Sequence, residues 1–403
     1  MKYAILDLET TISNSGNPFD QTNKIVCGGI LHGGEIKSII DYDLGTNWDT
    51  IRKYKDVLNS SLVVGFNLKF DLNWLRRYGL DYSNIRIWDC QLAKFLMSNQ
   101  EHKYPSLDET LEEYGYPPKL DVVKTEYWEK GIDTDQVPRP LLSEYLHIDL
   151  IRTEQVFKHQ LQLFKTQQYK HLYSLFRLQC QDLLALADIE YNGVYFNSKG
   201  AREKANEIHK EQEEILRDIR KFFDDVPFSL TSDLHLSTLL YGGVILEETT
   251  IPVGLYKTGA RAGQVKYKNS FIPYKCPRLV DPLKGTEVRT EVSKKELKLI
   301  DDGILTEPRQ YWSVNEDTLK QLKVKGEGKK IVGLIMRYNK LDKLRSTYLE
   351  GWPKLIDEMN WEENILHSQL NQTFVVTGRL SSSKPNGQNA DKLTKLYCES
   401  RYE

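Results

Sequence analysis

Cysteine and long apolar runs are both scarce in this chain of 403 residues. No apolar stretch is long enough to span a bilayer, and the first residues lack the pattern of a signal peptide. The cysteines form no CxxC pair and no zinc spacing, which argues against a disulfide framework or a zinc domain. The simplest expectation is a cytoplasmic protein without a membrane partner. The five cysteines lie far apart, at Cys27, Cys90, Cys180, Cys276 and Cys398.

A strong charge of either sign is also missing. The net charge is -2, so the composition gives no global signal for nucleic acid, although acidic sites and basic patches can cancel in the sum. Residues 257–298 are rich in lysine and arginine and poor in acids. We expect an ordered insertion or mobile lobe near residues 243–310, and either a solvated surface or a nucleic-acid contact would explain its charge.

The first half of the chain alternates between strand and helix patterns. Strands are predicted at 3–8, 24–31, 36–41 and 62–66, with helices at 50–58, 68–78 and 107–114. Gly79 and Gly115 stand where the last two helices would stop. This order predicts a mixed sheet flanked by helices.

The second half reads as mostly helical. Residues 140–223 carry helical spacing almost throughout, and further helices are predicted at 234–240, 316–322 and 332–354. The length of the chain favours two or three domains, and we place a boundary near residue 165.

Carboxylates occur at three places in the first half of the chain. Each can be explained by solvent exposure or helix capping, and each can also belong to a shared carboxylate site. Asp7 and Glu9 are two apart on a strand and share a face, although a strand end that emerges into solvent looks the same. Asp71 falls in a first helical turn, where a capping carboxylate is common. Tyr145 and Asp149 are four apart on a helix, and most such pairs are solvated.

Taken together, the four carboxylates suit hard cations. Oxygen-only ligand sets favour Mg²⁺ or Mn²⁺, and two such ions about 4 Å apart stabilise the attacking and leaving oxygens of a phosphoryl displacement. Tyr145, one helical turn from Asp149, would orient or help deprotonate the attacking water.

Three motifs, DLET, NLKFD and YLHID, occur in this order and resemble those of the DEDD-type 3'–5' exonucleases. The resemblance implies an RNase H-like fold, two divalent metal ions and the tyrosine subtype, because Tyr145 lies four residues before the last aspartate. Glu144 stands where the histidine subtype has its histidine, so His147 is expected to be a bystander. The residues implied are Asp7, Glu9, Asp71 and Asp149 as metal ligands and catalytic residues, Tyr145 as catalytic, and Asn67 and Phe70 as substrate contacts.

Three later stretches resemble family-A DNA polymerases of the DNA polymerase I type. LADIEYNGV (186–194) resembles the start of the thumb, and RYNKLDKLRSTY (337–348) resembles a thumb helix. TGRLSSSKPNGQN (377–389) would otherwise pass for a flexible tail, but it resembles the motif at the thumb–palm junction, with Gly387 where leucine is usual. The implied DNA contacts are Lys343, Ser346, Thr347, Arg379, Ser381, Asn386 and Gln388.

The resemblance implies an exonuclease domain at 1–165, a thumb-like helical region at 166–365 with the basic insertion, and the thumb–palm junction with the start of the palm at 366–403. The fold class is therefore α/β followed by a mainly α thumb. The nucleotide-binding helix and palm aspartates of the family do not follow, so we expect no polymerisation by this chain alone. A truncated chain and a polymerase split between two polypeptides both remain open.

The expected function is proofreading 3'–5' exonuclease activity together with primer–template binding. The partners implied are a single-stranded DNA 3' end, a primer–template duplex and a separately encoded fingers–palm subunit. A phage source would place the protein in the host cytoplasm. Two alternatives stay open: an RNA-trimming exonuclease of the ribonuclease D type, and a non-catalytic DNA-binding scaffold.

Overall fold

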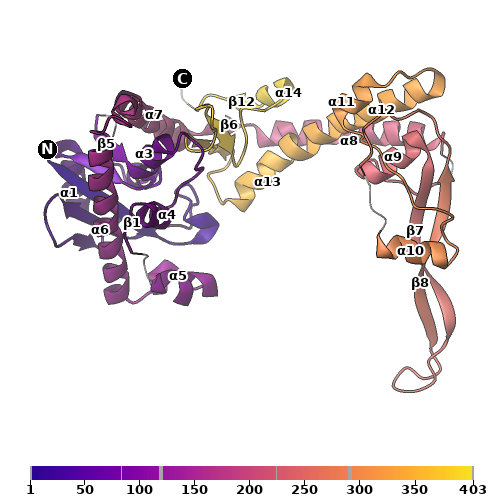
Figure 1. Ribbon diagram of the computed structural model, residues 1–403, viewed down its shortest axis with the longest axis horizontal. Coiled ribbons are helices and arrows are strands. Elements are labelled where there is room, and N and C mark those ends of the chain that lie inside the picture. Colours follow the sequence, from indigo (N-terminus) through magenta and orange to yellow (C-terminus); the bar gives the residue numbers. More distant parts are fainter. Residues whose placement is uncertain (1, 83, 118–120, 224, 289–292, 402–403) are drawn as a thin grey trace. The chain divides into compact units, whose positions relative to one another are not determined.

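The computed structural model describes residues 2–82, 84–117, 121–223, 225–288 and 293–401. These residues form two compact units (Figure 1). Unit 1 combines residues 1–200 with 351–403, and unit 2 consists of residues 201–350. The boundary predicted near residue 165 falls inside unit 1, and the three-domain division remains a prediction.

A five-stranded mixed sheet forms the centre of unit 1. Its order is β3-β2-β1-β4-β5, with β1 and β2 antiparallel, β2 and β3 antiparallel, and β1, β4 and β5 mutually parallel. β1 is central and its even-numbered positions are buried, so it carries the core of the unit. The strands are β1 (Tyr3–Thr10), β2 (Ile25–His32), β3 (Ile39–Asp41), β4 (Leu62–Gly65) and β5 (Arg86–Asp89).

Helices pack on this sheet, and the longest, α6, lies across it in Figure 1. Local chemistry fixes several of their ends: Asn47 caps α1, Ser106 and Glu109 form a capping box on α4, and Gly79 follows α2 with a φ of +82°. The helices are α1 (Trp48–Ser60), α2 (Leu68–Arg77), α3 (Cys90–Met97), α4 (Leu107–Glu113), α5 (Val122–Glu126), α6 (Arg139–Leu163) and α7 (Tyr173–Asn192).

The end of the chain returns to unit 1. Trp361 donates a hydrogen bond to Asn17 at 3.3 Å, and the His367 ring stacks on Phe19 with centroids 4.0 Å apart. Two small sheets lie here, one with the order β12-β6-β9 and one pairing β10 with β11. The elements are β6 (Val194–Phe196), α13 (Gly351–Glu358), β9 (Ile365–Leu366), β10 (Gln369–Asn371), β11 (Ser381–Ser383), α14 (Lys392–Lys395) and β12 (Cys398–Glu399).

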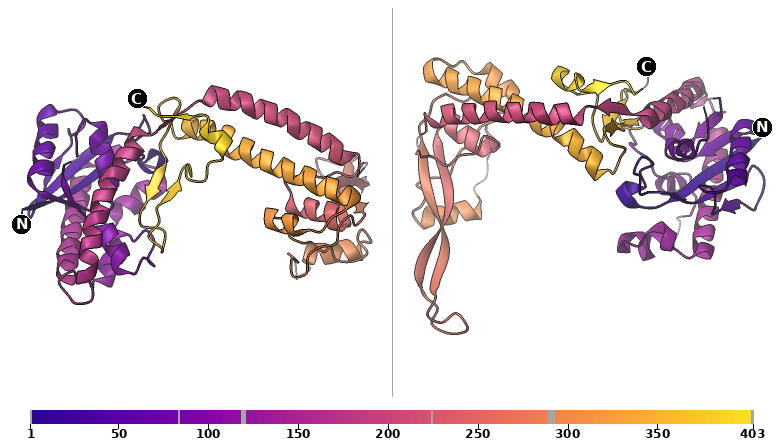
Figure 2. Two further views of the ribbon diagram at one scale, coloured as in Figure 1. Left: turned by 90° about the horizontal axis from the view of Figure 1, so that it is seen from above. Right: turned by 180° about the vertical axis from the view of Figure 1, so that it is seen from behind.

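Unit 2 is helical apart from one long antiparallel ribbon made of β7 and β8. Figure 2 shows this ribbon twisting along its length, as two-stranded ribbons do. The elements are α8 (Ser198–Arg220), α9 (Asp233–Tyr241), β7 (Gly243–Leu255), β8 (Val265–Cys276), α10 (Lys294–Asp301), α11 (Glu316–Gln321), α12 (Gly326–Asp342) and the π-helical segment η5 (Lys343–Leu349).

The structure departs from the predicted elements in several places. The region near 243–310 contains an ordered ribbon and a helix. The helix predicted at 332–354 begins earlier, and widens into η5 before α13. β5 and α3 had no counterpart in the prediction. Among the described residues, no helix is both long and apolar enough to cross a bilayer.

Candidate active site

Asp7 and Glu9 lie on the central strand β1, on the face that meets α6. Glu9 is buried, and the Asp7 side chain is half-buried. The backbone amide of Leu8 donates a hydrogen bond to Asp7 Oδ1 at 3.1 Å. Both carboxylates therefore occupy fixed positions at the end of a strand whose other residues form the core.

A glycine on the neighbouring strand allows α6 to approach this face. Gly29 pairs with Asp7 across β1 and β2, and a Cβ at Gly29 would lie only 2.7 Å from Leu150 Cδ1 and 3.0 Å from Leu146 Cγ. A larger residue would push the helix away. This close approach positions Asp149, which is buried on α6 beside Leu150.

The structure brings three of the four predicted carboxylates into one cluster. One ligand oxygen from each of Asp7, Glu9 and Asp149 lies within 4.8 Å of the others. These are hard oxygen ligands and they are largely shielded from water, which suits Mg²⁺ or Mn²⁺. The predicted convergence of residues from a strand and a helix more than a hundred positions apart is thus present.

Asp71 lies beside this cluster, in the first turn of α2, and is 2% exposed. Its Oδ1 atom is buried and has no hydrogen-bond partner among the described residues. Burial, and then the negative charge of Asp7, raise the pKa of the Asp71 carboxyl well above its ordinary value. A buried carboxylate oxygen without a partner, next to other carboxylates, is what a cation-binding site requires.

Tyr145 lies one turn before Asp149 on α6, with its ring edge-to-face against Trp128 at 5.6 Å between centroids. Burial, and then the charges of Asp149 and Glu9, raise the pKa of the Tyr145 phenol. The hydroxyl is therefore protonated near neutral pH, which favours orientation of a water over its deprotonation. His147 on the same helix hydrogen-bonds to Ser38 at 2.8 Å.

A polar cavity of about 220 Å³ lies beside the N-terminus of α2. Asn67 and Phe70, two predicted substrate contacts, line it, and Asn67 has a left-handed φ of +59°. The Asp89 carboxylate accepts hydrogen bonds from the Leu68 and Leu92 amides at 2.7 and 2.8 Å, which joins α2 to α3. Burial raises the pKa of Asp89 to about 6.

The loop between α3 and α4 borders the same cavity. Tyr104 lines the cavity, its amide donates to the Thr373 carbonyl at 3.0 Å, and its ring stacks on Phe374 with centroids 5.3 Å apart. Both rings remain exposed, at 46% for Tyr104 and 39% for Phe374. Lys103 Nζ lies 4.9 Å from the centroid of the Phe374 ring. The result is a partly exposed aromatic surface with an adjacent cation.

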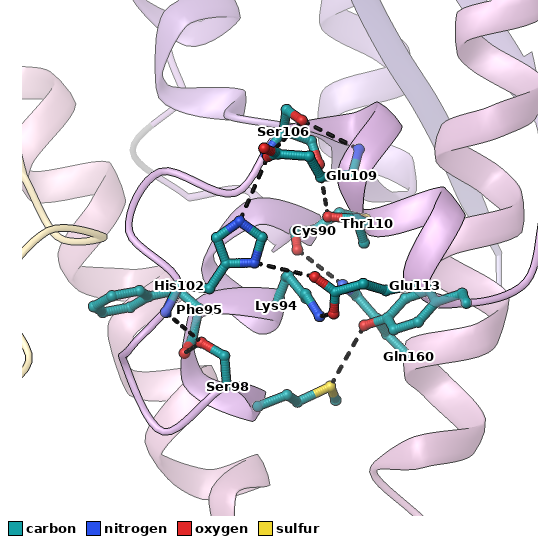
Figure 3. Close-up of polar contacts among 12 residues, drawn as sticks. Cys90, Lys94, Phe95, Ser98, His102, Ser106, Glu109, Thr110, Glu113 and Gln160 are labelled. Carbon is teal, nitrogen blue, oxygen red and sulfur yellow. Dashed lines mark hydrogen bonds and ion pairs between the residues drawn. The ribbon is translucent and has the colours of Figure 1, made fainter. Parts of the chain in front are cut away.

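Hydrogen bonds hold this loop in place (Figure 3). The His102 imidazole lies between the carboxylates of Glu109 and Glu113, at 3.5 and 3.2 Å. Glu113 also pairs with Lys94, and the His102 amide donates to Ser98 Oγ at 3.2 Å. The loop that carries Lys103 and Tyr104 is therefore attached at both ends to helices packed on the sheet.

The TGRLSSSKPNGQN stretch is structured. β10 and β11 form a hairpin in which Gln369 pairs with Ser383, and the buried Ser382 Oγ accepts a hydrogen bond from the Gly387 amide at 3.2 Å. A flexible tail is excluded for this segment. Of the predicted DNA contacts here, Ser381 is half-buried on β11, whereas Arg379, Asn386 and Gln388 are exposed.

Three more predicted contacts lie on η5 in unit 2. Lys343, Ser346 and Thr347 are exposed, while Leu344 and Tyr348 of the same segment are buried. Ser346 Oγ donates to the Asp342 carbonyl at 2.7 Å. The segment thus presents a polar face made of the three predicted contacts, and π-helical segments are frequent at functional sites.

Comparison with known proteins bears on these stretches. The profile described as "DNA polymerase family A" matches residues 290–401. A DNA polymerase of Bacillus phage SP01 is 24% identical over 335 residues, which is 81% of this chain and 33% of the phage protein. The thermostable DNA polymerase I of Thermus aquaticus is 46% identical over 70 residues, 17% of this chain and 8% of that protein. Residues 290–401 of the chain are therefore similar to DNA polymerase family A.

A solved structure has a similar fold. The "POL domain of Pol1 from M. smegmatis", solved with a DNA primer-template and dNTP, has a TM-score of 0.60 and 13% identity, and the match covers 98% of this chain and 54% of that one. This chain therefore spans about half of that domain and a third of the phage polymerase.

Sequence reasoning missed several residues of this candidate site. Lys69, Glu190, Asp89 and Tyr104 all line the cavity, but no motif contains Glu190 or Tyr104 in a recognised role. Lys69 lies within NLKFD, and that motif was the one signal that pointed to it.

Proposed function

We propose that the chain removes nucleotides from DNA 3' ends by metal-dependent phosphodiester hydrolysis, as the exonuclease part of a family-A polymerase. The observation that carries the proposal is the meeting of Asp7, Glu9 and Asp149, with ligand oxygens within 4.8 Å of one another. The sheet order β3-β2-β1-β4-β5 supports an RNase H-like domain around it.

The donor set fits two divalent cations. Asp7, Glu9 and Asp149 would hold them together with Asp71, whose buried Oδ1 lacks another partner among the described residues. When bound, the ions would supply an activated water and offset charge on the leaving oxygen. Tyr145 would hold that water in line through its hydroxyl.

The surroundings of the carboxylates suit a nucleic-acid end. The cavity beside Asn67 and Phe70 would accept the terminal nucleotide, and the rings of Tyr104 and Phe374 would stack on unpaired bases. Unit 2 would act as the thumb, and the hairpin that carries Arg379 would grip the primer–template near the palm. We also predict that DNA synthesis requires a second chain that carries the fingers and palm. Mixing the two chains on a primed template tests this prediction.

Degradation of a 5'-labelled single strand tests the proposal. The wild-type chain is expected to shorten DNA with Mg²⁺ or Mn²⁺ and not with EDTA, whereas Asp7→Ala/Asp149→Ala loses the activity and keeps its fold. Loss of a metal-binding carboxylate removes several kcal/mol of transition-state stabilisation. A double variant that still shortens DNA would contradict the site assignment.

The same assay separates the alternatives. Preferential shortening of RNA would support the ribonuclease D type. A wild-type chain that binds DNA but never degrades it would support a scaffold. The carboxylate cluster argues against the scaffold, because holding like charges together destabilises a protein that gains no ligand from them.

A further inference from the structure

Most of the β7–β8 ribbon lies in a stretch of chain with charge of one sign, and the exceptions are Glu247 and Glu248 on β7. Residues 249–280 contain no aspartate or glutamate. The same stretch contains six cationic side chains, and all six are exposed: Lys257, Arg261, Lys266, Lys268, Lys275 and Arg278.

The base of the ribbon is fixed to the body of unit 2. Ile245 and Cys276 are buried there, and Arg278 Nε donates to the Tyr241 carbonyl of α9 at 3.1 Å. Beyond the base, the strands pair as far as Leu255 and Val265 with one register shift between Pro252 and Gly254, and the loop end extends past α10 in Figure 1. A fixed base and a long paired stem give the cations defined positions.

The ribbon and α10 enclose a groove of about 450 Å³. Lys268 lines one wall and Lys295 and Lys298 line the other, opposed by one acid, Asp302. Lys295 Nζ lies 5.0 Å from the Phe271 ring centroid. The remaining lining residues are Ile251, Asn269, Ser270, Leu299 and Ile304.

Of the two acidic residues of α10, Asp301 is exposed and does not line the groove, and Glu296 does not neutralise these lysines. Glu296 is buried and accepts hydrogen bonds from the Arg309 amide and Nε, each at 3.0 Å. Lys266 is two residues from Lys268 on β8, so both project to the same face and continue the positive charge toward the loop.

Three lysines in one groove repel each other unless an anion lies between them. A sugar–phosphate backbone offers anions at regular intervals, and a neutral donor such as Ser270 commonly contacts phosphate oxygens. We propose that the groove between the ribbon and α10 binds the phosphate backbone of DNA. The identification of the bound polyanion as DNA rests on the proposed function. The inference that the groove binds an anion rests on its lysines alone.

The test compares two variants that remove equal charge from unit 2. Lys268→Ala/Lys298→Ala takes one lysine from each wall of the groove. The control, Lys204→Ala/Lys221→Ala, removes one lysine of α8 and the lysine that directly follows α8, which pair with Glu207 and Asp218. Affinity for a labelled primer–template duplex is measured from about 50 to 200 mM salt, the range in which phosphate contacts dominate the change.

In a plot of the logarithm of duplex affinity against the logarithm of salt concentration, the slope of the groove variant is expected to be shallower than that of the wild type by about 2. Across this salt range, the affinity of the groove variant therefore falls about tenfold less than that of the wild type. The control keeps the wild-type slope, and both variants degrade short single strands at the wild-type rate. A groove variant with an unaltered slope would overturn the proposal. If the wild-type chain degrades nothing, the proposed function fails, while the binding measurement still decides the groove.

Discussion

The ammonium group of Lys69 on α2 and the carboxylate of Glu190 on α7 form an ion pair beside the candidate active site, with side chains only 17% and 6% exposed. Glu190 also accepts hydrogen bonds from Asn73 Nδ2 and the Leu370 amide. A single carboxylate thus joins the NLKFD motif on α2, α7 and the hairpin strand β10.

Glu190→Ala is expected to lower the free energy of unfolding by about 3–5 kcal/mol, because it leaves a buried cation without its partner. Chemical denaturation measures this loss. Glu358→Ala is the control, since Glu358 pairs with Lys354 on an exposed surface and such pairs contribute about 0–1 kcal/mol. Equal losses in the two variants would contradict a structural role for the buried pair.

Asp71→Asn is expected to raise the free energy of unfolding near neutral pH, without divalent cations, by more than about 1 kcal/mol. The folded-state pKa of Asp71 is raised, so its charge destabilises the fold increasingly as the pH rises above about 4, the ordinary pKa of an aspartate. The gain should therefore vanish in acid.

Asp108→Asn is the control for this measurement, because Asp108 lies in the first turn of α4 and is exposed. Thermal unfolding with and without Mn²⁺ gives a second readout. Metal should stabilise the wild-type chain and not Asp71→Asn. A variant less stable than the wild type at neutral pH would show that the buried carboxylate does not carry an unfavourable charge.

The clustering of Asp7, Glu9 and Asp149 could be anticipated from the sequence, because each motif fixes its residues locally. Alternation on β1 placed Asp7 and Glu9 on one face, and helical spacing placed Tyr145 beside Asp149. The partners of Glu190 could not be predicted, because Lys69 and Leu370 lie far away in the sequence. The approach of α6 to the sheet depends on Gly29, whose role appears only with Leu146 and Leu150 in place.

The strands of the β7–β8 ribbon were not predicted from the sequence, for a different reason. A strand pattern is recognised when one face is buried and the other solvated. Both faces of the outer part of β7 and β8 are exposed, so polar and apolar residues do not alternate there. Continuous pairing between the two strands, and not burial, holds this part of the chain together.

Tyr145→Phe is expected to slow DNA degradation by roughly 100-fold, because an orienting hydroxyl is lost while the ring remains. The apparent affinity for Mn²⁺, measured by titration of activity, should not change, since Tyr145 is not in the carboxylate cluster. An unchanged rate would leave Tyr145 with a packing role against Trp128.

Phe374→Ala is expected to weaken binding of short single strands by about tenfold, because stacking of a base on an aromatic ring contributes about 1–3 kcal/mol. The effect should appear in KM and not in kcat. Trp48→Ala removes another exposed aromatic ring in unit 1 and serves as the control. Equal affinities for Phe374→Ala and the wild type would exclude the Tyr104–Phe374 surface from the path of the strand.

Arg379→Ala tests whether the hairpin of β10 and β11 grips duplex and not the strand being shortened. Arg379 is exposed, and its guanidinium can bind phosphate in a bidentate manner. Primer–template affinity should therefore fall, with a salt slope shallower by about 1, while degradation of short single strands continues at the wild-type rate. Arg52→Ala on α1 removes an equal charge from the same unit and should change neither quantity. If single-strand degradation collapses in Arg379→Ala while duplex binding persists, the motif serves the exonuclease site, and the duplex must be held by other residues.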